Sequence, residues 1–131
     1  MQETNKYTNH SIEEIDIYLC KIKEQIKKEN FTVPVTDKRS KNKDFVNKYH
    51  LTKKKQKEIL MAVEPVDFCY SADDYKNKKE RHYIFARKYE LDSWGNINNV
   101  LVYIKIVQKK DNLVVIVSFH EPDKQLVHLF K

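Results

Sequence analysis

The sequence predicts an α+β domain in which N-terminal helices pack on a mainly antiparallel sheet. Ser11 and Glu14 form a capping box ahead of apolar residues spaced by three and four, which indicates an amphipathic helix. From residue 67 onward, apolar and polar residues alternate with the period of a β-strand. Two apolar runs then flank the polar residues 109–112, which indicates a β-hairpin.

The chain length and the apolar content predict one folded domain over residues 1–131. Hydrophobic residues make up 40% of the 131 residues, enough to bury a core. The longest apolar run, residues 113–117, is far shorter than the roughly 20 residues of a membrane helix. The polar N-terminus lacks a secretory signal, and Cys20 and Cys69 form no CxxC pair. We therefore expect a cytoplasmic protein with reduced thiols and no membrane partner.

The N-terminal half is predicted to hold three helices and one edge strand. The first helix follows Ser11, with Ile15, Leu19 and Ile22 on its buried face. Residues 31–35 predict a short edge strand, because Pro34 cannot donate to a strand ladder. Two further helices are expected, over residues 43–49 and from residue 52 to the proline at 65.

The C-terminal half is predicted to form the sheet. Residues 67–71 begin it, residues 73–81 read as a loop, and residues 83–89 form a strand with an aromatic and basic face. Turn chemistry covers residues 92–99, with Gly95 as the break. In the hairpin that follows, Tyr103 and Lys105 share one face, and residues 113–119 are apolar enough for an interior strand. Residues 126–130 form either a short final strand or a packed tail.

Several cofactor classes are excluded by composition. The chain has a single glycine, whereas the Gly-rich loops that bind nucleotide phosphates need several. The five histidines show none of the spacings of a zinc site. We therefore expect neither a nucleotide cofactor nor a metal.

The positive charge is concentrated in one stretch. Residues 38–57 contain nine Lys or Arg against one acid, Asp44, while the whole chain carries a net charge of +6. Such a stretch attracts a polyanion through counterion release. A solvated lysine-rich surface or an acidic protein partner is the alternative reading. The predicted nucleic-acid contacts are Lys41, Lys43, Lys53, Lys54, Lys55 and Lys57.

Three segments of the C-terminal half resemble the MqsR-type toxins of bacterial toxin–antitoxin systems, which belong to the RelE-like group of mRNA-cleaving endoribonucleases. The segment DFCYS at residues 67–71 stands where the family has DF, two further residues and a serine. The segment VYIKI at residues 102–106 and the segment IVSFHE at residues 116–121 match its next two strand motifs in order. In the N-terminal half only the layout of elements matches.

The resemblance implies a RelE-like fold, metal-free cleavage of mRNA and a neutralising antitoxin. Whether the mRNA is cut free or on the ribosome stays open. Tyr103 occupies the position of the family's catalytic tyrosine. His120 and Tyr70 stand where better-known members have lysines, and a family glutamine falls near Ala86. The chain thus departs from the family pattern at three of these four positions.

The residues can support this chemistry. Metal-free RNA cleavage needs a group that accepts the 2′-hydroxyl proton, a group that protonates the leaving 5′-oxygen, and cations that stabilise the intermediate. His120 is predicted to be the acid or base, because imidazole titrates near neutral pH. Tyr103 could hold or protonate a phosphate oxygen, and Lys105 and Arg87 could stabilise its charge. Each residue also has a purely structural interpretation. His120 could simply be a polar residue that ends a strand, and Tyr103 an ordinary aromatic residue of the sheet. Lys105 and Arg87 could be solvated cations.

A second hypothesis is a non-catalytic binding protein on a toxin-like scaffold, such as a phage- or plasmid-borne inhibitor of a nucleic-acid enzyme. It would use the basic stretch to engage RNA, DNA or an acidic cleft. On this reading, charge reversal at the lysines of residues 53–57 abolishes activity, and changes at His120 and Tyr103 do not.

Overall fold

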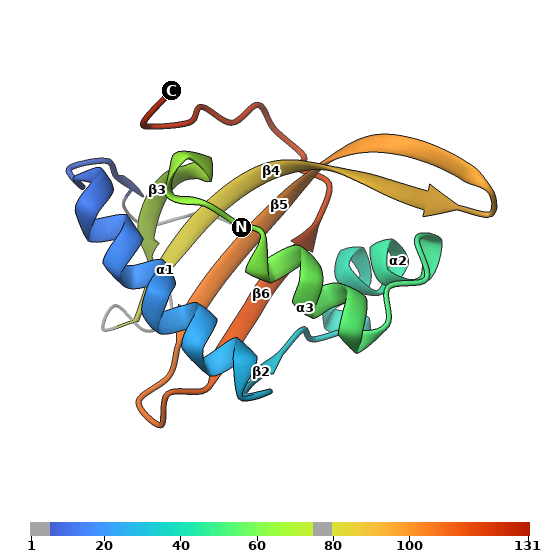
Figure 1. Ribbon diagram of the computed structural model, residues 1–131, viewed down its shortest axis with the longest axis horizontal. Helices are drawn as coiled ribbons and strands as arrows, with labels where there is room; N and C mark the ends of the chain where they lie inside the picture. The colour runs from blue at the N-terminus through green and yellow to red at the C-terminus, as the bar shows by residue number, and fades with distance from the viewer. Residues whose placement is uncertain (1–5, 75–79) are drawn as a thin grey trace.

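The helices α1 and α3 lie on one face of a twisted sheet (Figure 1). The computed structural model describes residues 6–74 and 80–131. The strands of these residues are β1 (Lys6–Tyr7), β2 (Phe31–Thr32), β3 (Phe68–Asp73), β4 (Arg81–Ser93), β5 (Asn96–Gln108) and β6 (Val114–His120). The helices are α1 (Ile12–Lys27), α2 (Ser40–Lys48) and α3 (Lys53–Met61), with the 3₁₀ turns η1 (Asp37–Arg39) and η2 (Pro65–Asp67).

The described strands form one sheet in the order β1-β3-β4-β5-β6-β2. Every neighbouring pair is antiparallel except β2 and β6, which run parallel. The predicted α+β class with a mainly antiparallel sheet is therefore confirmed. The parallel pairing makes β6 an interior strand over its first residues, as its continuous apolar character predicted.

Helix α1 begins where the capping box predicted. The Ser11 side chain accepts a hydrogen bond from the Glu14 backbone N–H, and the Glu14 carboxylate accepts one from the Ser11 N–H. Its apolar stripe is buried against the sheet, with Ile15 fully inaccessible and Ile22 nearly so. Helix α3 is capped by Thr52, also as predicted.

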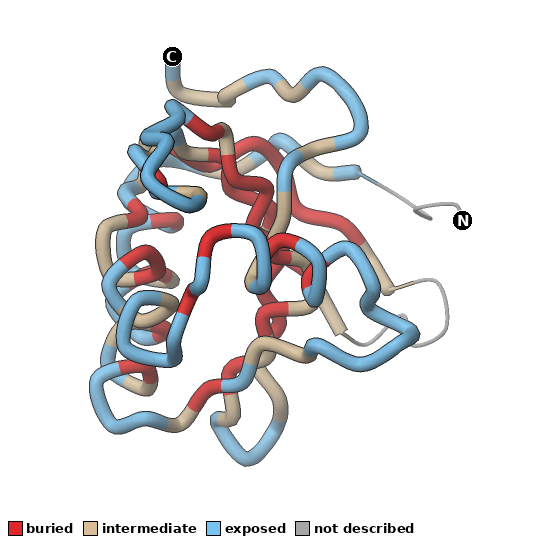
Figure 2. Tube along the Cα trace, turned by 90° about the vertical axis from the view of Figure 1, so that its right-hand side faces the viewer, coloured by how far each residue is buried: buried red, intermediate tan, exposed pale blue. Residues whose placement is uncertain are grey.

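The main core lies between the sheet and these helices, and Figure 2 shows buried residues following the strands and the inner sides of the helices. Alternate residues of β5 enter it, among them Val102, Ile104 and Ile106. Tyr83, Phe85 and Tyr89 of β4 join this side. The aromatic face predicted for residues 83–89 is thus turned toward the helices, where it contributes to packing.

The structure corrects the predicted turn at residues 92–99 and decides between the two alternatives for residues 126–130. The turn predicted over residues 92–99 is reduced to Trp94 and Gly95, because β4 and β5 continue on either side as a long hairpin that projects past the rest of the sheet (Figure 1). Gly95 has a φ of 89°, which suits a glycine at a tight turn. Residues 126–130 form a packed tail and no strand. The short β1 was not predicted, and most of the predicted loop at 73–81 lies outside the described residues.

None of the helices in the described part of the chain combines the length and apolar character that a membrane span requires.

Candidate functional site

A cleft of about 650 Å³ opens on the sheet face opposite the main core. Tyr103 and Lys105 of β5 form its floor, since their side chains alternate with the core residues of that strand and each is less than a tenth exposed. Ser118 and His120 lie beside them on β6. The remaining lining residues are Lys6, Arg39, Lys41, Pro122, Asp123 and Lys124.

A β-bulge in β6 places Ser118 and His120 in the cleft. Ile116 lies opposite Ile106, and Ser118 lies opposite Lys105, so Val117 is an extra residue in the ladder. The bulge reverses the alternation of side chains along the strand. Before it, even-numbered residues such as Ile116 enter the core; after it, the even-numbered residues face the cleft.

The buried side chain of Asn42 on α2 holds this part of β6. Its amide nitrogen donates to the carbonyl oxygens of Val117 (3.1 Å) and Pro34 (2.9 Å), and its oxygen accepts from the Phe119 N–H (2.8 Å). β2 pairs with the outer edge of β6 only at Val114 and Val115, and the Asn42 amide hydrogen-bonds to the same strand further along. All three hydrogen bonds satisfy backbone groups that α2 would otherwise bury without a partner.

Tyr103 and His120 are cross-strand neighbours, with ring centroids 5.5 Å apart. The His120 Nδ1 lies 2.7 Å from the Glu121 carbonyl oxygen. A carbonyl oxygen can only accept, so Nδ1 carries the hydrogen, and Nε2 of the neutral ring is left as a proton acceptor. The imidazole of His120 and the phenol of Tyr103 thus lie side by side on one face of the sheet.

The cleft is strongly basic. Among the described residues, five cationic side chains line it, from Lys6, Arg39, Lys41, Lys105 and Lys124, against the single carboxylate of Asp123. Asp123 pairs with Lys41, and this hydrogen bond lowers the pKa of the carboxyl below its usual value. The nearby His120 adds a smaller lowering effect. Such a surface attracts anions.

Tyr70 lies near the same cleft on β3. The ammonium groups of Lys6 and Lys124, both cleft residues, lie 4.7 Å and 5.7 Å from the centroid of its ring. Tyr70 is 7% exposed and packs with Tyr103 in a second apolar cluster on this side of the sheet. Its position therefore suits it to support the cleft cations.

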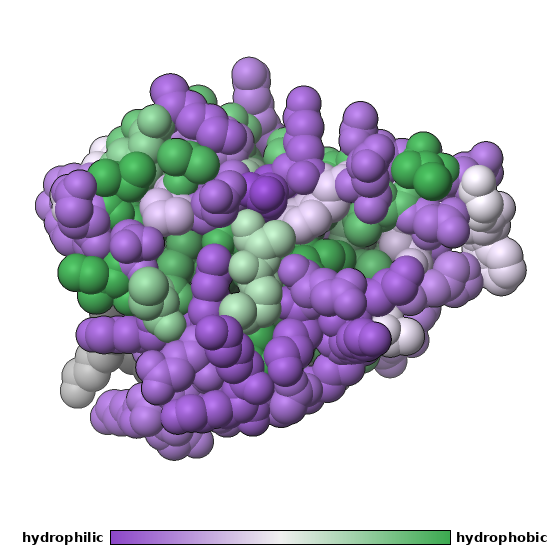
Figure 3. All heavy atoms as spheres, in the orientation of Figure 1, coloured by the Kyte–Doolittle hydropathy of each residue, from purple (hydrophilic) through white to green (hydrophobic). Residues whose placement is uncertain are grey.

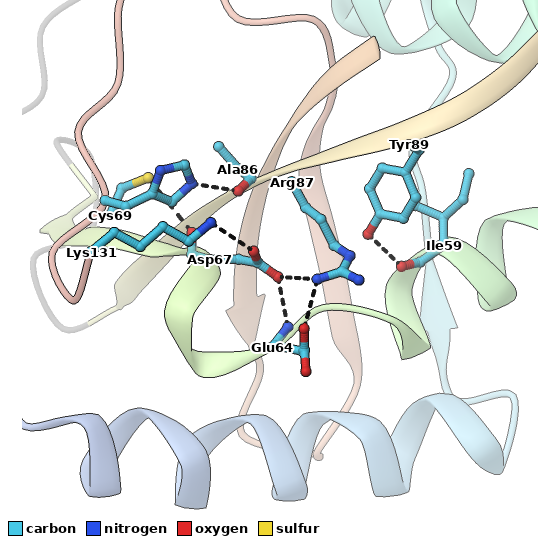
Figure 4. A network of polar contacts seen from close by, with 9 residues as sticks. Ile59, Glu64, Asp67, Cys69, Ala86, Arg87, Tyr89 and Lys131 are labelled. Carbon is cyan, nitrogen blue, oxygen red and sulfur yellow. Dashed lines mark hydrogen bonds and ion pairs between the residues drawn. The ribbon is translucent and has the colours of Figure 1, made fainter. Parts of the chain in front are cut away.

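Arg87 is not brought into the cleft. It lies opposite Val102 in the β4–β5 ladder and so points to the helix side of the sheet. There it pairs with Glu64 at 2.9 Å and with the buried Asp67 at 3.1 Å (Figure 4). Desolvation works against its charge, but the two carboxylates outweigh it and raise the pKa of Arg87. The structure therefore does not bring Arg87 together with Tyr103 and His120, and places it on the opposite face of the sheet.

The predicted basic stretch divides between two sides of the molecule. Lys41 lines the cleft, and Lys43 on the same helix pairs with Asp37. Lys53 contacts Phe31, and Lys57 pairs with Glu29. The remaining lysines of α3, Lys54 and Lys55, are exposed on this helix, and neither they nor Lys53 and Lys57 line the cleft.

The sequence did not single out several cleft residues. Arg39 lies within the basic stretch, so its composition offered a signal. Ser118 lies in the strand motif before His120. Lys6 and Lys124 come from opposite ends of the chain, and only the pairing of β1 with β3 and the path of the tail bring them together.

Metal ligands do not cluster in the described ranges 6–74 and 80–131, where no group of three His, Cys, Asp or Glu side chains is placed to hold an ion.

No protein-family model matches the chain, and no curated protein matches it at a significant level.

Replacing Asn42 with alanine should remove the side chain that hydrogen-bonds to the backbone of Val117 and Phe119 in β6. We expect a loss of about 3 kcal/mol in the free energy of unfolding, because buried backbone groups lose their partners. Urea unfolding followed by circular dichroism measures it. Asn47→Ala, at an exposed position of the same helix, is the matched control and should change stability by less than about 0.5 kcal/mol. Equal losses in the two variants would contradict this role of Asn42.

His82, buried on the cleft side of β4, should make the protein less stable in acid. Burial, and to a smaller degree Lys105 and Lys109, lowers its pKa from 6.5, while Asp74 and Glu80 oppose the shift. The unfolded chain therefore binds more protons below about pH 6.5, and the free energy of unfolding falls as the pH falls through that value. Urea unfolding at about pH 7.5 and about pH 5.5 should show a smaller acid loss in His82→Gln. An unchanged loss would exclude His82 as its source.

Proposed function

We propose that the protein is a toxin of the MqsR type: a metal-independent endoribonuclease that cleaves single-stranded mRNA and so inhibits translation. The observation that carries the proposal is the cross-strand pair of Tyr103 and His120, with ring centroids 5.5 Å apart, inside a cleft lined by five cations. The motif order of residues 67–121 supports the same reading. A cognate antitoxin is the partner that this class implies.

RNA fits the charge of the cleft. The cations of Arg39 and Lys41 approach it from the α2 side, and Lys105 and Lys124 approach from the floor and the tail. A backbone that passes between them presents phosphates to both walls. These contacts are independent of base identity, and their strength should fall with salt.

Cleavage begins with attack of a ribose 2′-oxygen on the adjacent phosphorus. The Nε2 atom of His120 accepts the 2′-hydroxyl proton as the new P–O bond forms, because its Nδ1 is held as a donor by the Glu121 carbonyl. The bond from phosphorus to the 5′-oxygen then breaks, and the phenol of Tyr103 donates the proton that this oxygen takes up. The products are a 2′,3′-cyclic phosphate and a 5′-hydroxyl end.

Charge builds up on the phosphoryl oxygens during this step. Lys105 lies on the same face of β5 as Tyr103, two residues along, which supports a role for its ammonium in stabilising this charge. The substrate must be single-stranded, because the 2′-oxygen, phosphorus and 5′-oxygen have to come into line, which the A-form helix does not permit. RNA-binding proteins commonly select unpaired segments for the same flexibility.

Removal of either proton-transfer group should abolish most cleavage. His120→Ala is expected to lower kcat on a single-stranded RNA by about 10²–10⁴-fold, and Tyr103→Phe should have a similar effect. The assay follows cyclic-phosphate ends with a chelator present. His50→Asn, an exposed histidine outside the cleft, is the control and should keep full activity. An intact RNA with the wild-type protein, free and on ribosomes, together with normal growth on induction, would overturn the proposal.

Binding of RNA should depend on the cleft cations and not on α3. Arg39→Ala should weaken binding several-fold and reduce the slope of log affinity against log salt by about 1. Lys54→Ala, an exposed lysine of α3, should leave both unchanged. Fluorescence anisotropy of a labelled oligoribonucleotide at several salt concentrations measures the two variants. The reverse result would favour the binding-protein alternative, which relies on the lysines of α3.

A further inference from the structure

The outer edge of β4 is left open where the long hairpin leaves the body of the sheet. β3 pairs with β4 only from Arg81 to Phe85, while β4 continues to Ser93 in its pairing with β5. Within residues 6–74 and 80–131, no strand pairs with β4 beyond Phe85 on this side, and the tail reaches it at Ala86, whose carbonyl oxygen lies 2.7 Å from His128 Nε2. Such an edge presents backbone N–H and C=O groups that can pair with another strand.

An apolar groove of about 310 Å³ runs along this open edge. Tyr89 and Leu91 of β4 form one wall, and Leu51 and Ile59 form the other. Figure 3 shows hydrophobic residues reaching the surface between the hairpin and the helices, on a face that is otherwise mostly hydrophilic. The groove thus has room for side chains that an added strand would turn toward the helices.

Two contacts fix the hairpin relative to the helices. The Tyr89 hydroxyl donates to the Ile59 carbonyl oxygen at 2.7 Å. At the far end, the ring of Trp94 meets the ring of His50 edge-on, with centroids 4.5 Å apart. The edge between these points is held in place before a partner arrives, which lowers the entropic cost of binding there. Trp94 is 81% exposed and leaves more apolar surface at the end of the groove.

The rim of the groove has the opposite charge to the rest of the protein. In the part of the chain that the structure describes, three carboxylates line it, from Glu58, Glu90 and Asp92, against the single ammonium of Lys55. The whole chain carries +6, and the cleft on the other face is basic. Nucleic acid is therefore disfavoured at this edge, and a cationic segment is favoured.

We propose that the open edge of β4 binds an extended segment of a protein partner that alternates apolar and basic residues. The backbone of the segment would pair with residues 88–92, as in β-strand addition. Tyr89 and Leu91 pack with the main core, and Glu90 and Asp92 alternate with them at the rim of the groove, so the side chains of an added strand follow the same alternation. Its apolar residues enter the groove, and its Lys or Arg residues meet the carboxylates.

This inference does not rest on the proposed RNA cleavage, because none of its residues lines the basic cleft. Its test uses ¹⁵N-labelled full-length protein and a nine-residue peptide that alternates valine with lysine. The amide signals of residues 88–92 should shift, and their hydrogen exchange should slow. A peptide that alternates valine with glutamate should bind there at least tenfold more weakly. A valine–lysine peptide N-methylated on alternate residues should lose binding, since it cannot pair with the edge.

A double charge-reversal variant tests whether the carboxylates at the rim select a cationic segment. Glu58→Lys combined with Glu90→Lys should reverse the preference, so that the glutamate peptide binds at β4 and the lysine peptide does not. Equal binding of the methylated peptide, shifts confined to other residues, or no binding would overturn the proposal. A dimer of the free protein with protected amides at 88–92 would also overturn it, because the occupant would then be a second copy of this chain.

Discussion

The hydrogen bonds of the Asn42 amide hold α2 against the end of β6. The cleft is lined by residues from both of these elements, so its shape depends on this contact. The bulge at Val117 turns Ser118 and His120 away from the core, and it needs a partner on the outer side of the strand, where β2 has already ended. Asn42 supplies that partner from a helix whose next turn packs Phe45 against Phe119, with ring centroids 5.7 Å apart. The same helix carries Lys41 into the cleft. One buried side chain therefore links the position of the imidazole to the position of the cation beside it.

The two faces of the sheet serve different purposes, and the division follows from strand alternation. The face toward α1 and α3 is filled by aliphatic and aromatic residues and gives the fold most of its burial. The opposite face is covered only in part, by a smaller apolar cluster and the tail, so polar groups can reach solvent there. The charges follow a similar separation. The basic cleft and the acidic rim of the β4 edge lie in different parts of the molecule and share no lining residue among those described.

Local patterns predicted the helices and strands well, because their signals lie within a few residues. The capping box at Ser11 and the cap at Thr52 are such signals. The facing of Tyr103 and Lys105 also followed from alternation. The position of Arg87 could not be predicted in this way. Alternation places Arg87 on the same face as Tyr83 and Tyr89, but it does not say which face the helices cover. Its ion-pair partner Asp67 is twenty residues away in the sequence. The bulge at Val117 has no local signature, since no glycine marks it, and strict alternation would have left His120 on the side of Ile116.

The cleft draws on nearly the full length of the polypeptide, from Lys6 in the first strand to Lys124 in the tail. Asn42 and Val117 are 75 positions apart, and both must be in place before the last strand is held. A chain that has been synthesised only as far as β5 lacks β6 and the segment after it, so it cannot form the cleft. The cleft therefore assembles only after the chain has been synthesised at least as far as Lys124.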